Sequence, residues 1–145
     1  MTFRILPRLD RWNRGFWQGG QDGELRFWRC QDCGLYLHPP QPLCPQCHGK
    51  QLAIEAVSGR GTLASFSINH QQWMPGPDLP FVVAIVEMPE QPALRLTTNL
   101  INCNHDTIRC DMPVRVVFEH HHDPDGNSPD DDVWLPLFEP EPSGG

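Results

Sequence analysis

Two pairs of cysteines in the first third of the chain have the spacing of a metal site. Cys30 and Cys33 form one Cys-x-x-Cys motif, and Cys44 and Cys47 form another, ten residues further on. Each motif can fold into a tight knuckle that directs two sulfur atoms at one zinc ion, and the hairpin between them brings the knuckles together. The spacing therefore predicts a zinc ribbon whose ligands are Cys30, Cys33, Cys44 and Cys47.

The second motif has two other interpretations. His48 follows Cys47 directly, and Cys-x-x-Cys-His is the attachment motif of c-type haem, while Cys-x-x-Cys alone also serves as a redox dithiol. Haem attachment requires export, and the first 17 residues lack the apolar core of a signal peptide. The upstream motif favours zinc over both. Four thiolates leave no open coordination position, so we expect a structural ion. Gly34 and His48, which follow the knuckles, are expected at positive φ.

The composition of the chain argues against a nucleic-acid-binding protein and against a membrane protein. The chain has 145 residues, enough for one compact domain, and a net charge of −7 from 18 acidic and 11 basic residues. An acidic surface repels a nucleic-acid backbone. No apolar run approaches the ~20 residues of a membrane span, so we expect a cytoplasmic protein that binds no membrane. In that compartment Cys103 and Cys110 are expected to be free thiols.

The segment before the ribbon has the pattern of an amphipathic helix, predicted over residues 1–22. Leu9, Trp12 and Phe16 share one helical face, with Trp17 beside them. That face either covers the protein's own core or docks on a partner. Trp12, Phe16 and Trp17 are accordingly the candidate docking residues. The zinc ribbon is predicted over residues 23–57.

From residue 62 onward the pattern is all-β. Alternating or continuous apolar runs predict five strands, with the run at 81–88 in the centre of the sheet. Five strands without a strong helix are typical of an OB-type barrel, predicted over residues 58–140. Pro136 should place the last strand at an edge or end it early. The fold class is therefore mainly β, with a helix, a rubredoxin-like ribbon and a barrel; residues 141–145 are expected to be a disordered tail. The strands are expected at 62–70, 81–88, 93–100, 114–121 and 133–140.

Three consecutive histidines precede the acidic loop 123–132. Alternate residues of a strand face the same side, so only His120 and His122, and not His121, could converge on a metal. We expect the loop itself to be solvated. Its spacing fails the EF-hand pattern, although four of its residues faintly resemble a calcium loop: Asp123, Asp125, Gly126 and Asn127.

Several segments together resemble one known family. They are "GFWQGGQDGELRFWRCQDCGLYLHPPQPLCPQC", "VSGRGTLASFSINH", "LPFVVAIVEM", "MPVRVVF" and "LPLFEP". From about Phe16 to Pro140 the chain is similar to the bacterial and archaeal zinc-ribbon/OB-fold proteins catalogued as domain of unknown function 35. The four cysteines, the Phe16-Trp17 pair and the turn at Ser58–Gly61 are the most specific parts. Two departures are Phe81, where the family usually has tyrosine, and Asp111, where glycine is common.

The resemblance implies a non-catalytic accessory subunit with structural zinc. Family members accompany thiolase-like or lipid-transfer-type enzymes, and sometimes hydratases, that act on acyl-CoA. Their barrel faces the partner's acyl-CoA site and helps to enclose a shared ligand. Apolar walls suit a pantetheine arm and arginines suit its phosphates. For Trp73 a role as a barrel cap is an equal alternative. The candidate acyl-CoA residues are Arg60, His70, Trp73, Phe81 and Arg95.

Two further hypotheses remain beside the accessory subunit. The chain lacks a nucleophile elbow, a phosphate-binding glycine loop and an H-E-x-x-H motif, so we expect no catalysis by it alone. A zinc-ribbon/OB module for single-stranded nucleic acid needs cations among aromatic residues. The only cationic side chains in the predicted barrel strands and their connections are Arg95, Arg109 and Arg115, which disfavours the nucleic-acid alternative. A free-standing acyl-CoA carrier is the third hypothesis.

Overall fold

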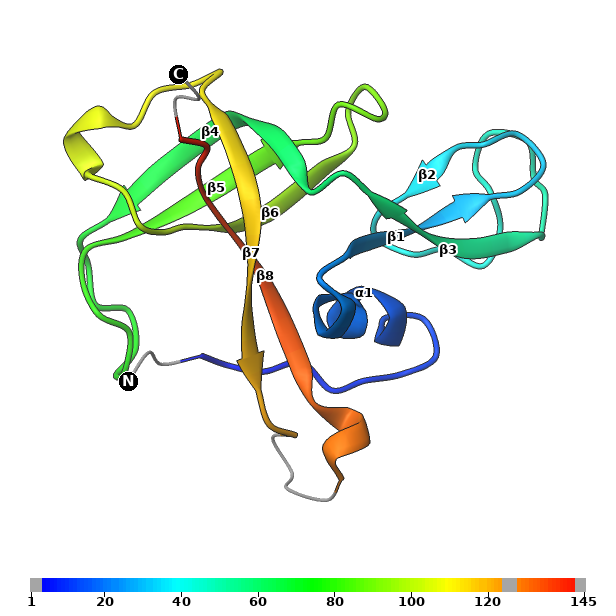
Figure 1. The fold of residues 1–145 in the computed structure, drawn as a ribbon, viewed down its shortest axis with the longest axis horizontal. Helices are drawn as coiled ribbons and strands as arrows, with labels where there is room; N and C mark the ends of the chain where they lie inside the picture. The colour runs from blue at the N-terminus through cyan, green and yellow to red at the C-terminus, as the bar shows by residue number, and fades with distance from the viewer. Residues whose placement is uncertain (1–3, 124–127, 143–145) are drawn as a thin grey trace.

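The computed structural model describes residues 4–123 and 128–142, and its two sheets contain all eight strands of that part (Figure 1). One sheet has the order β2-β1-β3, and a closed barrel has the order β4-β5-β6-β8-β7. The predicted fold class is confirmed. The ribbon strands are β1 (Leu25–Cys30), β2 (Tyr36–Leu37) and β3 (Leu52–Val57). The barrel strands are β4 (Arg60–Asn69), β5 (Phe81–Glu87), β6 (Arg95–Leu100), β7 (Pro113–His121) and β8 (Val133–Pro140).

The N-terminal helix is shorter than predicted. Helix α1 spans only Arg14–Gln18 and continues as the 3-10 helix η1 (Gly19–Asp22). Upstream, the Asp10 carboxylate accepts hydrogen bonds from the backbone N–H groups of Trp12 and Asn13, a local turn that competes with helix. The Trp12 carbonyl accepts a hydrogen bond from the indole N–H of Trp28 at 2.6 Å. This carbonyl would have to accept a backbone N–H if the helix began earlier, so its bond to the ribbon competes with a longer helix.

Two further 3-10 helices complete the helical elements of the described residues. The 3-10 helix η2 (His105–Thr107) follows β6, and η3 (Pro129–Asp131) precedes β8. Gly20 lets η1 lie against β7 and β8, because a Cβ there would collide with Trp134 and Phe118. Across residues 4–123 and 128–142, no helix is both long and apolar enough to cross a membrane.

Strand β5 is paired on both sides along most of its length, as predicted for a strand inside the sheet. It pairs with β4 on one side and β6 on the other. Val82, Ala84 and Val86 point inward and are buried, while the intervening residues are partly exposed. This alternation is what an antiparallel barrel wall requires, because successive side chains point to opposite faces.

Pro136 lies within β8 and leaves one wall of the barrel weakly paired. The strand does not end early, because Pro136 stays opposite Phe118 of β7. Its carbonyl points toward β6, where it accepts the Thr98 hydroxyl at 2.7 Å. Proline has no N–H to give to that side. Strand β8 therefore meets β6 in a single bridge, Leu100 to Phe138, and behaves as the predicted edge along most of its length.

A short connection joins the ribbon to the barrel. Ser58 and Gly59 link β3 to β4, and Gly59 has a φ of 80°, which suits glycine. Its carbonyl accepts the Val116 N–H at 2.7 Å. On the other side of the ribbon, the Gln91 side chain bonds both the N–H and the carbonyl of Tyr36. The barrel thus holds both outer strands of the ribbon.

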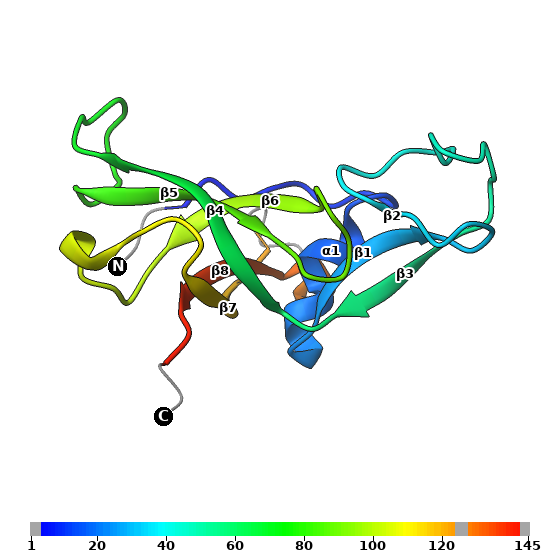
Figure 2. The same ribbon diagram turned by 90° about the horizontal axis from the view of Figure 1, so that it is seen from above.

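One hydrophobic core runs through the ribbon and the barrel, and Phe16 of α1 lies within it. In Figures 1 and 2, α1 lies between the ribbon and the barrel. The Phe16 ring stacks on Phe27 of β1 at 5.8 Å and contacts the His38 ring at 5.2 Å. Burial lowers the pKa of His38, because desolvation disfavours the charged imidazole. The buried position of Phe16 agrees with the hypothesis that this face covers the protein's own core.

Replacement of Phe16 by alanine should lower the free energy of unfolding by about 3 kcal/mol or more, because it leaves a cavity between ribbon and barrel. Urea denaturation followed by tryptophan fluorescence measures the change. Trp73→Ala is the control: its ring is 80% exposed, so we expect a change within about 0.5 kcal/mol. A Phe16→Ala protein as stable as the control would contradict the core role.

Candidate functional site

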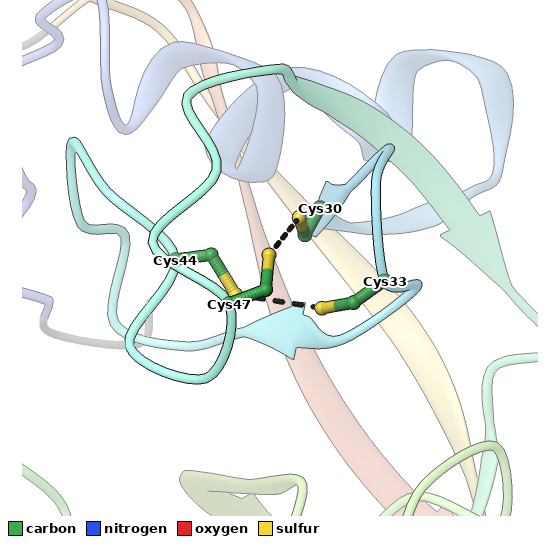
Figure 3. Close-up of side chains that lie close together, drawn as sticks. All are labelled: Cys30, Cys33, Cys44 and Cys47. Atoms are coloured by element: carbon green, nitrogen blue, oxygen red, sulfur yellow. Dashed lines mark hydrogen bonds between the residues drawn. The ribbon is translucent and has the colours of Figure 1, made fainter.

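The four predicted zinc ligands converge at the tip of the ribbon (Figure 3). Their sulfur atoms all lie within 4.8 Å of one another. Cys30 ends β1 and lies 3.6 Å from Cys47, while Cys33 lies 3.6 Å from Cys44, measured between sulfur atoms. All four are free thiols. The two sequence motifs therefore form one cluster.

Each knuckle is closed by backbone hydrogen bonds. The N–H of Gly34 bonds the Cys30 carbonyl, and the N–H of His48 bonds the Cys44 carbonyl, both at 2.9 Å. Gly34 and His48 have φ values of 85° and 62°, which confirms the predicted turn conformation. Gly49 completes the second knuckle, because a Cβ there would run into the Asp32 carboxylate.

The thiol pKa values separate within each knuckle. The backbone N–H of Cys47 lowers the pKa of Cys44 to about 7, against a smaller desolvation cost. The N–H of Cys33 lowers the pKa of Cys30 in the same way. For Cys47, the N–H of Gly49 lowers the pKa, but the neighbouring sulfur of Cys30, desolvation and the other two cysteines outweigh it and raise the pKa to about 12. A backbone N–H thus lowers the pKa of each of the four cysteines, and contacts with the neighbouring sulfur atoms separate the four values.

This donor set fits one zinc ion. Tetrahedral coordination with Zn–S bonds of about 2.3 Å places sulfur atoms about 3.8 Å apart, close to the 3.6 Å separations found here. Cys30, Cys33, Cys44 and Cys47 would hold the ion. It would crosslink the two knuckles, and four thiolates leave no position for a substrate or water. This centre is suited to stabilising the fold and not to chemistry.

A second feature is an apolar pocket of about 530 Å³ beside the weakly paired wall of the barrel. Strands β6 and β8 form its floor, including Leu100 and Pro136. Residues 4 and 5 and the α1 side chains Phe16 and Trp17 form one side. Met74 of the β4–β5 connection and Phe81, the first residue of β5, also line the pocket. The lining is mostly apolar, as in sites that accept small organic ligands.

Exposed apolar side chains gather around this pocket. Five large hydrophobic residues are exposed in the described part of the chain, and four of them lie on the pocket wall or in the β4–β5 connection: Ile5, Trp73, Met74 and Leu79. The fifth, Leu43, is in the ribbon. Such a concentration on one face indicates a surface that contacts another molecule.

The structure does not bring the five candidate acyl-CoA residues into one cluster. Phe81 lines the pocket, and His70 and Trp73 lie exposed in the β4–β5 connection that flanks it. Arg60 and Arg95 begin β4 and β6, at the opposite end of the barrel. At about 3.3 Å per residue, the ends of β4 are on the order of 30 Å apart. Acyl-CoA contact by these residues stays a prediction.

The three candidate docking residues have different surroundings. Phe16 is buried. Trp12 is partly exposed and packs on the Trp28 ring at 5.7 Å, with Arg11 over its ring at 4.8 Å. Trp17 is partly exposed and lines the pocket. Docking by these residues stays a prediction, and Trp17 is the one beside the exposed apolar face.

Sequence reasoning missed the two parts of the pocket that come from far ends of the chain. Arg4 and Ile5 reach it because the N-terminal segment extends along the barrel, where Arg4 bonds Glu119 of β7 at 2.9 Å. Leu135 and Leu137 contribute from β8. Pro136 was a usable signal, since a proline in a barrel strand indicates a weakly paired wall.

The acidic loop is not solvated throughout, which corrects one prediction. Asp132 is buried, and its carboxylate bonds the His120 ring and the Asp123 N–H. Asp131 forms an ion pair with Arg14 at 2.9 Å. The other residues of the faint calcium-loop resemblance, Asp125, Gly126 and Asn127, lie outside the described residues.

Comparisons with known proteins agree with this architecture. The family model "ChsH2, rubredoxin-like zinc ribbon domain" matches residues 17–53, and "ChsH2, C-terminal OB-fold domain" matches residues 55–119. A chain in the solved structure "Ltp2-ChsH2(DUF35) aldolase" superposes with a TM-score of 0.77 at 30% identity, covering 93% of this chain and 98% of that one. The chain belongs to this DUF35 family of zinc-ribbon and OB-fold proteins, as the sequence resemblance predicted. A DUF35 protein of unknown function from Sulfolobus solfataricus, at 12% identity, shares the fold with a TM-score of 0.59 over 90% of this chain and 86% of that one.

Three curated relatives are subunits of acyl-CoA enzymes by name. A probable enoyl-CoA hydratase alpha subunit of Thermomonospora curvata is 31% identical over 96% of this chain and 40% of its own length. The 3-oxo-4,17-pregnadiene-20-carboxyl-CoA hydratase alpha subunit of Mycobacterium tuberculosis is 35% identical over 79% and 36%. The benzoylsuccinyl-CoA thiolase subunit BbsA of Thauera aromatica is 31% identical over 67% and 65%. The chain thus spans about two fifths of the two hydratase subunits.

Replacement of Cys44 by serine should release zinc and unfold the ribbon, because metal binding at such sites is coupled to folding. Metal analysis should find about one zinc per wild-type chain and little in the variant, with loss of dispersed ribbon signals in an amide NMR spectrum. Cys110→Ser is the matched control, because Cys110 is an exposed free thiol outside the cluster. A folded ribbon without metal in Cys44→Ser would contradict the assignment.

Proposed function

We propose that this protein is a non-catalytic subunit that docks on a thiolase-like or lipid-transfer-type enzyme and helps to enclose its acyl-CoA substrate. A hydratase is the other partner class, because two relatives are hydratase subunits by name. The match over 98% of a chain in an aldolase of the Ltp2–ChsH2 kind supports an assembly of this type. The partner would be a separate chain or a further domain.

The observation that carries the proposal is the coincidence of the pocket with the exposed apolar side chains. An open pocket holds a ligand weakly, since solvent still reaches one side of it. A partner seated on Ile5, Trp73 and Met74 would cover apolar surface that is otherwise exposed, and would close the pocket at the same time. The zinc ribbon contributes indirectly, because it packs with Phe16 behind the pocket wall.

The predicted acyl-CoA residues fall into two groups: apolar side chains that would line the pocket and arginines that would bind the phosphates. Phe81, with Trp73 beside it, would supply apolar wall for the acyl or pantetheine part. Arg60 and Arg95 are ion-paired with Glu141 and Glu87, at 3.3 and 3.0 Å. They would bind CoA phosphates only by exchanging these carboxylates for the ligand. Such an exchange is feasible for exposed pairs, which contribute little to stability.

The same ion pairs weigh against the nucleic-acid alternative. Arg115 of β7 also pairs with a carboxylate, Glu139, at 2.6 Å. Three of the cations along the barrel strands are thereby neutralised by neighbours. A single-stranded nucleic-acid groove needs uncompensated positive charge along the path of the backbone.

Affinity capture from extract of the source organism tests the docking. Wild-type protein should retain a thiolase-like, lipid-transfer-type or hydratase enzyme, identified by mass spectrometry. The triple variant Ile5→Ala, Trp73→Ala, Met74→Ala should retain at least tenfold less, because it removes apolar contact area. Leu43→Ala, an exposed hydrophobic residue away from the pocket, is the control and should retain as much as wild type. Equal retention by the triple variant, or nucleic acid as the retained species, would contradict the proposal.

Calorimetric titration with coenzyme A distinguishes a shared site from a free-standing carrier. We expect the isolated chain to bind coenzyme A at least tenfold more weakly than its complex with the captured enzyme, because the chain supplies only part of the enclosure. Equal affinity of chain and complex would favour the carrier hypothesis.

A further inference from the structure

Two histidines and a buried aspartate meet where β7 and β8 end their pairing. The His120 Nε2 atom lies 2.9 Å from Asp132 Oδ2, and the His122 Nδ1 atom lies 3.4 Å from the same oxygen. One potential ligand atom from each of the three residues lies within 4.8 Å of the other two. His121, between the two histidines, points elsewhere and bonds Glu119 at 2.6 Å. The alternation along the strand thus selects the first and third histidine.

The surroundings hold two of these side chains in place. The Asp132 side chain is only 9% exposed, and its second oxygen accepts the Asp123 N–H at 2.9 Å. The oxygen shared by the two imidazoles is therefore fixed in direction. The His120 ring stacks on Trp134 at 4.4 Å with an interplanar angle of 6°. The His122 side chain is 89% exposed and meets the edge of the His120 ring at 5.1 Å, so it is the least restrained of the three.

We propose that His120, His122 and Asp132 bind one divalent transition-metal ion, zinc or ferrous iron, at a second site distinct from the cysteine cluster. Two imidazoles and one carboxylate are a ligand set that these ions accept. Bonds of about 2.0–2.1 Å at tetrahedral angles place ligand atoms about 3.3 Å apart. The two separations from Asp132 Oδ2, 2.9 and 3.4 Å, bracket that value.

A site with three protein ligands differs from the four-cysteine cluster in its coordination. Its three ligands leave at least one coordination position for water or for a group brought by another molecule. The ion would also tie the end of β7 to the start of β8, next to η3 and its contacts with α1. Arg14 of α1 bonds the Asp130 carbonyl and the Asp131 carboxylate there. This site would therefore stabilise the side of the barrel on which α1 is anchored.

A hydrogen-bonded network without metal is the alternative for the same geometry, and metal titration separates the two. The experiment uses the full chain without a histidine tag, with the cysteine cluster loaded to one zinc per chain as measured by metal analysis. Zn²⁺ is then titrated calorimetrically. Co²⁺ serves as a second probe, because a site of nitrogen and oxygen ligands gives visible bands without sulfur-to-cobalt charge transfer.

We expect one further equivalent of Zn²⁺ in wild type. His122→Ala should weaken that step at least tenfold, since even changes behind the ligands cost 10–100-fold. The exposure of His122 makes misfolding a poor explanation for such a loss. His121→Ala is the matched control and should bind as wild type does. The proposal is overturned if wild type takes up no second equivalent, if His122→Ala binds equally well, or if His121→Ala loses as much affinity as His122→Ala.

Discussion

The packing of Phe16 between the ribbon and the barrel is the contact on which the rest of the structure depends. A ribbon of three short strands has too little apolar surface to form a core of its own. Here Leu25, Phe27 and Tyr36 of the ribbon join the core of the barrel, and Phe16 fills the space between them. The thiolate cluster closes the far tip, while this aromatic contact sets the position of the ribbon relative to the barrel.

The position of the pocket follows from that arrangement together with one proline. Because α1 is anchored by Phe16, the adjacent Trp17 lines the pocket. Pro136 limits main-chain pairing between β6 and β8, so this wall offers apolar side chains in place of a continuous hydrogen-bonded ladder. Stability and the candidate binding surface therefore share residues, and a substitution in α1 affects both.

The two candidate metal centres differ in how the chain brings their ligands together. The cysteine cluster is made from two motifs whose knuckles form through bonds between residues four apart. The other cluster takes His120 from the end of β7, His122 from just after that strand, and Asp132 from the residue before β8. Its geometry depends on the strand register, in which His120 lies opposite Trp134. The first is suited to structural support, and the second leaves coordination positions open.

The sequence by itself determined the ribbon, the barrel class and the family. Cysteine spacing and alternation act over a few residues, where geometry is nearly independent of context. The sequence pattern overestimated the length of the N-terminal helix, because the Asp10 turn and the bond from Trp28 to the Trp12 carbonyl compete with helical hydrogen bonds. Only the tertiary structure decided that Phe16 is core, that the N-terminal segment lines the pocket, that Arg60 and Phe81 lie at opposite ends of the barrel, and that Asp132 is buried beside two histidines. These are contacts between residues distant in sequence, and strand register and chain path set them, which no local pattern encodes.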